Sequence, residues 1–275
     1  SFYYETIKSW ERSDATVNKI RISPGLPVES FRKLVEEVAI VTLNNQNYEM
    51  FYRGQNIDYK DSQGAYYKDK TPRTIIYPTI CRPDRKKDGT YKPFIRKSRI
   101  VERYDDLKRM IELTGQECYQ LDELNLSLFQ HYEVLPTPFI DITQSLRIAA
   151  TFALRKSKTG YLYVFGLPFP NGSISHFFDQ GIVLIKLQNV SPPRAFRPRY
   201  QEGYLVGKFP IRPTKEASDN LARRLVAKFH LKNNSTFWDE EFTPMPEELL
   251  FPKDDAFEHR LNELKRNFFK KHILK

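Results

Sequence analysis

Three polar segments of this 275-residue chain carry side chains suited to binding an anion or to chemistry on a small ligand. The first is Phe51-Tyr52-Arg53-Gly54-Gln55, in which a short aromatic run ends on arginine and glycine. The rigid guanidinium of Arg53 matches a phosphate or a carboxylate, and Gly54 lets a ligand or a turn approach the backbone closely. We therefore regard Arg53 as a candidate anion-binding residue, with Tyr52, Gly54 and Gln55 beside it.

The other two segments add an imidazole, amides and carboxylates. The second segment covers residues 130–143 and contains Gln130-His131-Tyr132, followed by Asp141 and Thr143. It crosses from an expected helix through a turn into a strand and the start of another helix. The third segment is Gln201-Glu202-Gly203-Tyr204, which lies between a proline-rich loop and an expected strand. All three segments are set in apolar surroundings.

Each segment also has a structural interpretation. Arg53 can pair with Asp141 across a sheet, and Thr143 stands where a helix N-cap belongs, so that its hydroxyl satisfies the first turn. His131 can be a hydrogen-bonded core histidine, and residues 201–203 can form a polar turn. For a single segment the structural interpretation is favoured, whereas the occurrence of all three in one chain favours a functional one.

The elements that must carry these segments follow from the hydrophobic periodicity. Helical spacing predicts helices over residues 28–43, 98–113, 121–132, 215–231 and 256–274, with a further helix after residue 143. Aromatic and β-branched runs predict strands at residues 50–52, 139–142, 161–165, 182–185 and 204–206. Helices come first and strands gather later, which predicts a single α+β domain with a mixed or antiparallel central sheet decorated by helices.

The composition excludes several classes of protein. Hydrophobic residues make up 40% and charged residues 28%, which excludes wholesale disorder. No apolar run approaches the roughly 18 residues of a membrane-spanning helix, so no membrane contact is expected. The two cysteines, Cys81 and Cys118, cannot build a disulfide framework, which favours a reducing, cytoplasmic location. The five histidines are scattered, so no metal site is expected.

The charge leaves two interpretations open. Forty-four Lys and Arg residues against 34 Asp and Glu give a net charge of +10, which raises the question of a nucleic-acid partner. No basic run exceeds the three residues 85–87, so a role in solubility is slightly favoured. Basic and aromatic residues nevertheless alternate at 196–200 and 266–271, which supports the alternative of a non-enzymatic module that binds nucleic acid or a nucleotide.

The three segments, in this order, resemble the FRG domain family, named for its Phe/Tyr-Arg-Gly motif. The family's next segment, Leu/Tyr-Pro-x-x-x-Arg, is matched by Tyr77-Pro78-Thr79-Ile80-Cys81-Arg82. Its Gln-His-Tyr-Gly-Leu-Pro-Thr-Arg-Leu-Leu-Asp-Trp-Thr signature is matched by residues 130–132, 136–137, 141 and 143, and its late Gln-x-Gly-aromatic motif by residues 201–204. The resemblance runs from Glu49 to the last helix. It places a domain at residues 48–275, including the basic C-terminal helix, behind an N-terminal strand and helix extension over residues 1–47.

The chain departs from the family signature at three places. Pro138 stands where the family has arginine, which removes a positive group from the expected pocket. Ile142 replaces the tryptophan that follows the aspartate, and Glu133 and Val134 together replace the usual single glycine.

The plan of the family is similar to that of ADP-ribosyltransferases, so the resemblance implies an ADP-ribosyltransferase-like fold and NAD as co-substrate. It implies that Arg53 holds a phosphate or ribose of NAD, that Thr143 lies with Asp141 beside the nicotinamide ribose, and that Gln201 or Glu202 takes the late catalytic position. An aromatic ring of Tyr52, Tyr132 or Phe139 would face the nicotinamide. The expected binding residues are Tyr52, Gly54, Gln55, Arg82, His131, Tyr132 and Asp141.

The resulting hypothesis is an NAD-dependent transferase that acts as an effector, in phage defence or as a toxin. It would transfer ADP-ribose to a protein or nucleic-acid acceptor that the sequence does not identify. The hypothesis expects the three far-apart segments to fold together into a single cleft.

Overall fold

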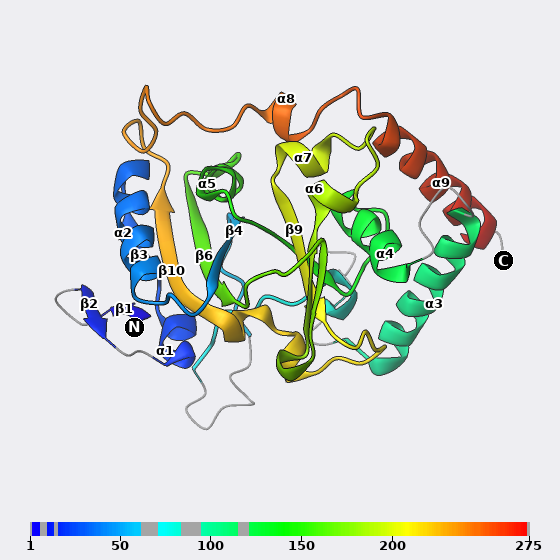
Figure 1. Ribbon diagram of the computed structural model, residues 1–275, viewed down its shortest axis with the longest axis horizontal. Helices are drawn as coiled ribbons and strands as arrows, with labels where there is room; N and C mark the ends of the chain where they lie inside the picture. The colour runs from blue at the N-terminus through cyan, green and yellow to red at the C-terminus, as the bar shows by residue number, and fades with distance from the viewer. Residues whose placement is uncertain are drawn as a thin grey trace. The chain divides into compact units, whose positions relative to one another are not determined.

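The structure of the protein is a computed structural model that describes residues 2–5, 10–13, 16–61, 71–83, 95–114 and 121–273 (Figure 1). The chain forms two compact units, and each is assembled from three separate stretches of sequence. The first unit comprises Ser1–Ile76, Ile142–Pro170 and Asn220–Pro246, and the second comprises Tyr77–Asp141, Asn171–Asp219 and Glu247–Lys275.

The first unit contains a run of four hydrogen-bonded strands, and two of its helices, α2 and α5, pack on one face of them. The strands take the order β3-β10-β6-β4; β3 runs parallel to β10 and the other neighbours are antiparallel. A separate antiparallel pair is formed by β1 and β2. The strands are β1 (Phe2–Glu5), β2 (Trp10–Ser13), β3 (Leu26–Val28), β4 (Glu49–Gln55), β6 (Thr159–Leu167) and β10 (Leu225–Lys232). The helices are α1 (Val17–Ile22), α2 (Phe31–Leu43), α5 (Leu146–Leu154) and the short 3-10 turn η5 (Leu221–Arg224).

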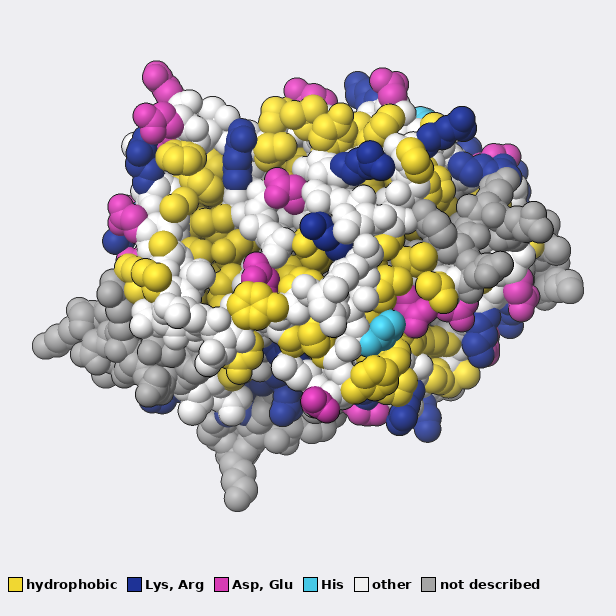
Figure 2. Space-filling view, in the orientation of Figure 1, with side chains coloured by type: hydrophobic (Ala, Val, Ile, Leu, Met, Phe, Trp, Pro, Cys, Tyr) yellow, Lys and Arg dark blue, Asp and Glu magenta, His cyan; other side chains and the backbone are white. Residues whose placement is uncertain are grey.

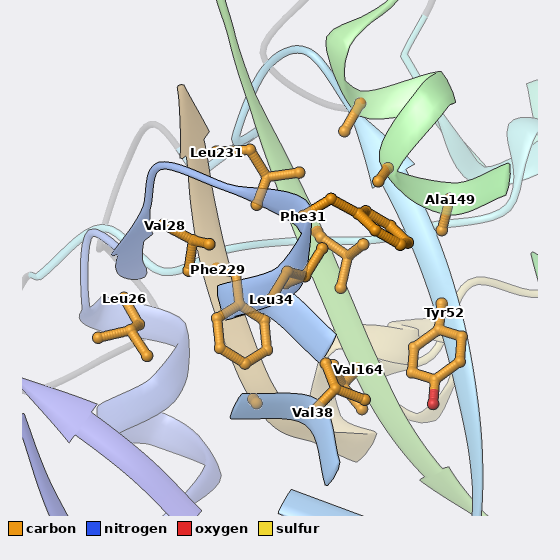
Figure 3. Packing of buried hydrophobic residues seen from close by; sticks show 14 of the residues in the cluster. Leu26, Val28, Phe31, Leu34, Val38, Tyr52, Ala149, Val164, Phe229 and Leu231 are labelled. Atoms are coloured by element: carbon orange, nitrogen blue, oxygen red, sulfur yellow. The ribbon is translucent and has the colours of Figure 1, made fainter. Parts of the chain in front are cut away.

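The core of the first unit lies between the sheet and helices α2 and α5 (Figure 3). Helix α2 begins after the N-cap Ser30, whose side chain accepts a hydrogen bond from the Lys33 amide, and it buries one apolar stripe. Strands β6 and β10 contribute alternate residues to the same core, as a half-buried strand must. Members of this core include Phe31, Leu34, Val38, Tyr52, Ala149, Val164, Phe229 and Leu231.

The second unit has a sheet of strand order β5-β9-β8-β7 and most of the remaining helices. Antiparallel pairing joins β7 to β8 and β8 to β9. The strands are β5 (Phe139–Thr143), β7 (Ile174–Phe177), β8 (Ile182–Lys186) and β9 (Gly203–Lys208). The α-helices are α3 (Lys97–Thr114), α4 (Asp122–His131), α6 (Leu187–Val190), α7 (Arg197–Tyr200), α8 (Glu247–Leu250) and α9 (Ala256–Ile273). The 3-10 turns are η1 (Thr79–Cys81), η3 (Phe178–Gln180) and η4 (Ala217–Asp219).

A separate apolar core holds the second unit together. The C-terminal helix α9 packs into it through Leu261 and Phe268, with Phe257 and Leu264 half-buried beside them. This agrees with the helical spacing that predicts a helix over residues 256–274. Strand β5 passes from this unit into the first, because its last two residues, Ile142 and Thr143, belong to the first unit. Other core members are Leu107, Met110, Leu128, Phe129, Val183, Ile185 and Leu205.

The expected α+β class with mixed strand pairing is confirmed, but one predicted helix is wrong. The stretch 215–231 forms two short 3-10 turns and strand β10 instead of a helix. Phe229 and Leu231 face the core, whereas Lys228 and His230 alternate with them, which is the two-residue period of a strand. Among the described helices, none combines the length and the apolar run needed to cross a membrane.

Candidate functional site

The first polar segment occupies the end of β4 in the first unit. Successive side chains of a strand leave on opposite faces, so Tyr52 and Gly54 face the helices while Arg53 and Gln55 face the other way. Arg53 Nε donates to Gln55 Oε1 at 2.8 Å. The segment therefore presents a guanidinium braced by an amide on the sheet face that helices α2 and α5 leave uncovered.

Gly54 has a packing role. A Cβ atom at Gly54 would lie 1.8 Å from the carbonyl oxygen of Ala149 and 2.6 Å from the amide nitrogen of Ala153, both on α5. Gly160, on the neighbouring strand β6, meets α5 in the same way, with 2.1 Å to the carbonyl oxygen of Ala153. Only glycine permits this approach of helix to sheet. The sequence singled out Gly54 for a close approach, and the approaching group is the α5 backbone.

Thr143 lies next to the first segment but on the other face of the sheet. It pairs with Tyr52 across the β4–β5 ladder, and paired residues of an antiparallel ladder share a face. The side chain of Arg53 therefore leaves the sheet on the opposite side. The expected N-cap at Thr143 is wrong, because Ser145 caps α5, while Thr143 Oγ1 accepts a hydrogen bond from the Ser145 amide at 3.0 Å.

The second segment builds a hydrogen-bonded network in the second unit. Gln130 Nε2 donates to one carboxylate oxygen of Asp141 at 2.7 Å, and His131 Nδ1 lies 3.1 Å from the other. Both donors come from the last turn of α4, and Asp141 lies on β5 after a turn through residues 132–138. The Asp141 side chain is 37% exposed, whereas that of His131 is 2% exposed. A partly exposed carboxylate is thus held from behind by two buried donors.

Two threonines fix the orientation of the Gln130 amide. The Gln130 Oε1 atom accepts hydrogen bonds from the hydroxyl groups of Thr137 and Thr79, the latter at 3.2 Å. The Thr137 amide in turn donates to the Thr79 hydroxyl at 2.9 Å. Because the oxygen of the Gln130 amide is directed to the threonines, its nitrogen is directed to Asp141. The Pro-Thr pair of the signature therefore supports the carboxylate through Gln130.

The third segment meets this network at the His131 ring. A carboxylate oxygen accepts hydrogen bonds, so His131 Nδ1 carries the proton that it donates to Asp141. His131 Nε2 is buried and has no hydrogen-bond partner among the described residues. A Cβ at Gly203 would lie 3.4 Å from His131 Cε1 and 3.0 Å from a methyl group of Leu187. The glycine of the third motif thus lets β9 pass close to the histidine of the second.

The two polar residues before Gly203 differ in their surroundings. Gln201 is buried, and its Nε2 donates to the carbonyl oxygen of Leu250 at 2.8 Å, which ties α8 to the turn. Glu202 is exposed and has a φ of 44°, in the left-handed region that non-glycine residues rarely adopt. Such strain of about 1–3 kcal/mol is often kept at functional sites. Of the pair, Glu202 is the residue that reaches solvent.

Three aromatic rings expected to face a ligand are buried. Tyr52 lies in the core of the first unit, where burial and the nearby Glu49 raise its pKa. Phe139 is fully buried in the core of the second unit. Tyr132 donates its hydroxyl to Asp255 Oδ2 at 2.8 Å, and burial together with that carboxylate raises its pKa. None of these rings presents an open face for nicotinamide.

Tyr132 belongs instead to a junction that anchors α9. Asp255 Oδ1 accepts hydrogen bonds from the amides of Phe257 and Glu258 at the start of α9, both at 3.1 Å. Its other oxygen accepts from the Tyr132 hydroxyl and from the Arg197 amide. The residue expected to bind substrate therefore holds the C-terminal helix in place.

The remaining expected binding residue, Arg82, lies beside η1. Its Nε donates to the Tyr77 carbonyl at 2.9 Å, so the two ends of the Tyr-Pro-x-x-x-Arg segment are joined. Arg103 of α3 donates to the carbonyl oxygens of Thr79, Ile80 and Arg82, at 3.2, 2.8 and 2.7 Å. The segment is thereby fixed in the same part of the second unit as Thr79, which supports Gln130.

The basic-aromatic stretch 196–200 is partly committed to the fold. The Arg197 side chain is 9% exposed, lies 4.8 Å from the ring centre of Phe251 and approaches the carboxylates of Glu133 and Glu258. Its charge is balanced inside the second unit. On the face drawn in Figure 2, Lys and Arg side chains are interspersed with Asp and Glu instead of forming one continuous patch.

A buried ionic cluster in the first unit escaped the sequence reasoning. Lys228 Nζ is fully buried and donates to Asp58 Oδ2 at 3.1 Å and to the Thr74 hydroxyl at 3.0 Å. Tyr163 donates to the other Asp58 oxygen at 3.0 Å. Burial lowers the pKa of Lys228, which Asp58 opposes, and burial and Asp58 raise the pKa of Tyr163. The sequence feature that could have indicated this cluster is the isolated Lys228 between apolar residues of β10.

The structure divides the expected site residues between the two units. The first unit holds Arg53 and Thr143 with Tyr52, Gly54 and Gln55, and the second holds His131, Tyr132, Asp141, Gln201, Glu202 and Arg82. Within the described ranges, no three His, Cys, Asp or Glu side chains are grouped so as to hold a metal ion. Comparison with family models, with curated proteins and with solved structures found no match to the chain.

Proposed function

We propose that this protein is an ADP-ribosyltransferase-like enzyme that uses NAD and transfers ADP-ribose to an acceptor. The observation that supports this best is the meeting of the second and third segments in the second unit. There Gln130 and His131 hold the Asp141 carboxylate, and Gly203 packs against the His131 ring next to the exposed Glu202. Asp141 and Glu202, which are 61 residues apart in the sequence, are thus linked through the His131 ring.

Transfer of ADP-ribose from NAD requires carboxylates near the ribose and near the incoming nucleophile. The bond between C1′ of the ribose and the nicotinamide nitrogen breaks, and its electron pair leaves with nicotinamide. Positive charge develops on the ribose, and a fixed carboxylate stabilises that charge more in the transition state than in the ground state. Asp141 supplies it at the ribose, because its position is set by two buried donors. Glu202 accepts the proton of the incoming nucleophile as the acceptor bonds to C1′.

The resemblance gives Arg53 a phosphate of NAD and Thr143 the ribose, but these two side chains leave the sheet on opposite faces of the first unit, so the reaction is proposed on Asp141 and Glu202 alone. The proposal places the enzyme in the cytoplasm, as a phage-defence effector or a toxin. Cys81 agrees with a reducing compartment: it is a buried free thiol, and burial raises its pKa to about 12.

Release of nicotinamide from NAD tests the proposal. Purified protein is incubated with NAD and cell lysate, and free nicotinamide is quantified by chromatography. The wild type is expected to release nicotinamide, and Asp141→Asn and Glu202→Gln are each expected to slow the release about 100-fold or more. Glu263→Gln is the matched control, because this exposed carboxylate on α9 pairs only with Arg260 in the described contacts; it should react like the wild type.

Two results would overturn the proposal. One is the absence of NAD binding together with the absence of nicotinamide release. The other is equal release by the wild type and the Asp141 variant, which would detach the reaction from this carboxylate. The alternative function is separated in the same experiment: Glu202→Gln should leave any binding of RNA unchanged, and binding to RNA that weakens steeply with salt, without NAD cleavage, would favour a nucleic-acid-binding module.

A further inference from the structure

The face of the first unit's sheet opposite α2 and α5 carries a row of polar and aromatic side chains. Gln55 on β4 lies opposite Tyr161 on β6, and Tyr161 lies opposite His230 on β10. Paired residues of antiparallel strands share a face and have Cβ atoms about 5 Å apart. The three side chains therefore form one row across three strands, and Arg53 joins it through its hydrogen bond to Gln55.

The neighbouring row on the same face is buried at Tyr163 and Lys228, whereas Arg53 at its end is half-buried. Arg53 pairs with Tyr163, and Tyr163 pairs with Lys228. Tyr163 and Lys228 are buried; Tyr163 is hydrogen-bonded to Asp58, and Lys228 to Asp58 and Thr74. By contrast, Gln55, Tyr161 and His230 are half-buried. Tyr163 and Lys228 therefore serve the fold. The accessible part of this face is the row formed by Gln55, Tyr161 and His230.

Two aromatic rings of the accessible row are stacked on each other. The rings of Tyr161 and His230 are stacked, with centroids 4.9 Å apart and planes inclined by 15°. Burial and the charge of Lys232 lower the pKa of His230, against the opposing effect of Asp58, which favours the neutral form of its imidazole. A neutral imidazole on a phenol provides π-surface and ring nitrogens that can bond to a heterocycle.

We propose that Arg53, Gln55, Tyr161 and His230 form a binding site for a nucleotide. The guanidinium of Arg53 binds the phosphate, and the stacked rings of Tyr161 and His230 pack against the base. The site lies within the first unit and goes beyond the proposed transfer reaction, whose carboxylates belong to the second.

In this site the phosphate and the base are recognised by different residues. Titration calorimetry with AMP, adenosine and ribose 5-phosphate measures the contribution of the phosphate and that of the base separately. Wild-type protein should bind AMP more tightly than either fragment. Tyr161→Leu should weaken AMP and adenosine about 5- to 100-fold, the range found when stacking on one base is lost, and leave ribose 5-phosphate unchanged. Arg53→Gln should weaken AMP and ribose 5-phosphate and leave adenosine unchanged.

Two further variants control for damage to the fold. Tyr161→Phe keeps the ring and should bind AMP within about threefold of the wild type. Tyr48→Leu is the matched control, because this exposed tyrosine precedes β4 in the same unit and packs near Gly166, on the opposite face. It should leave all three titrations unchanged. If Tyr161→Leu does not fold, saturation-transfer NMR on the wild type should show the adenine protons in closest contact with the protein.

The proposal is overturned if wild-type protein does not bind millimolar AMP, or if Tyr161→Leu binds AMP like the wild type. It is also overturned if Tyr48→Leu and Tyr161→Leu weaken AMP equally. Because the readout is binding of AMP, a failure to cleave NAD leaves this test intact. Conversely, if the protein cleaves NAD in a way that depends on Asp141 but does not bind AMP, the nucleotide site proposed here is wrong and the proposed function is still supported.

Discussion

Buried charges in this protein are placed by partners far away in the sequence. Lys228 finds Asp58, which lies 170 residues earlier, and both are surrounded by hydroxyl groups that complete their hydrogen bonding. Asp141 is held in a similar way by Gln130 and His131, but it keeps part of its surface in solvent. The first arrangement serves the fold, and the second leaves a carboxylate where a ligand can reach it.

The Lys228 pair predicts a large effect on stability. Lys228→Met should lower the free energy of unfolding by about 3–5 kcal/mol, because it leaves the Asp58 carboxylate buried without its counter-charge. Adding Asp58→Asn should recover part of the loss. Urea denaturation measures both variants.

Lys232→Met is the matched control for that measurement. Lys232 pairs with Glu29 on the surface, where both side chains are about half exposed, so its loss should cost at most about 1 kcal/mol. Equal effects of the two lysine substitutions would contradict a buried, structurally required pair.

At the scale of elements, the close contact between α5 and the sheet depends on residues without a side chain. Gly54→Ala should destabilise the protein by about 3 kcal/mol, because its Cβ would meet the α5 backbone, which cannot yield as a flexible side chain can. Gly172→Ala, where the nearest atom is 3.7 Å away, should change stability by less than about 0.5 kcal/mol. Thermal unfolding followed by circular dichroism distinguishes them; a tolerated alanine at position 54 would refute this packing.

The end of α4 explains one departure from the family signature. Glu133, at the position of the usual glycine, has a φ of 53°, and the Val134 amide bonds back to the Phe129 carbonyl at 2.8 Å, as in a helix end closed by a left-handed residue. Glycine adopts this conformation without strain.

Glu133→Gly should therefore raise the free energy of unfolding by about 0.5–1 kcal/mol, despite losing an exposed contact with Arg197. Glu133→Ala removes the same carboxylate but keeps the strain, so it should bring no gain. Denaturant midpoints of the two variants decide the matter, and a stabilising alanine would show that the charge, not the backbone, is responsible.

Hydrophobic periodicity was sufficient to predict some helices and strands but not others. Helix α2 and strand β6 were predicted because their apolar periodicity matches the faces that they bury. The stretch that contains β10 was predicted as a helix because Leu221, Leu225 and Phe229 repeat at helical spacing. The two-residue period of a strand was not recognised at Lys228 and His230, because a lysine is expected to be exposed. The partner that allows Lys228 to be buried, Asp58, is remote in the sequence.

For the candidate site, motif spacing identified Gln130, His131 and Asp141, which do interact. It did not foresee that Tyr132, one residue further on, points into the α9 junction, because that orientation depends on Asp255. It also missed Tyr161 and His230, which pair across strands and match no motif.

At the scale of the whole molecule, the chain builds two cores, and each gathers three stretches of sequence. The chain has an excess of ten positive charges. On the face drawn in Figure 2, Lys and Arg side chains lie among Asp and Glu, and the charge of Arg197 is balanced internally. The net charge by itself therefore gives only weak support for a polyanionic partner. The arrangement of Arg53, Tyr161 and His230 gives stronger support for binding of a nucleotide.

The proposed function requires the Asp141 carboxylate, held by Gln130 and His131, to face the ribose of NAD. A crystal structure of the protein soaked in NAD tests this most directly. We expect a ribose hydroxyl within hydrogen-bonding distance of Asp141, about 2.6–3.2 Å between oxygens. A bound NAD whose ribose makes no contact with Asp141, or a lattice that takes up no NAD at saturating concentration, would contradict it.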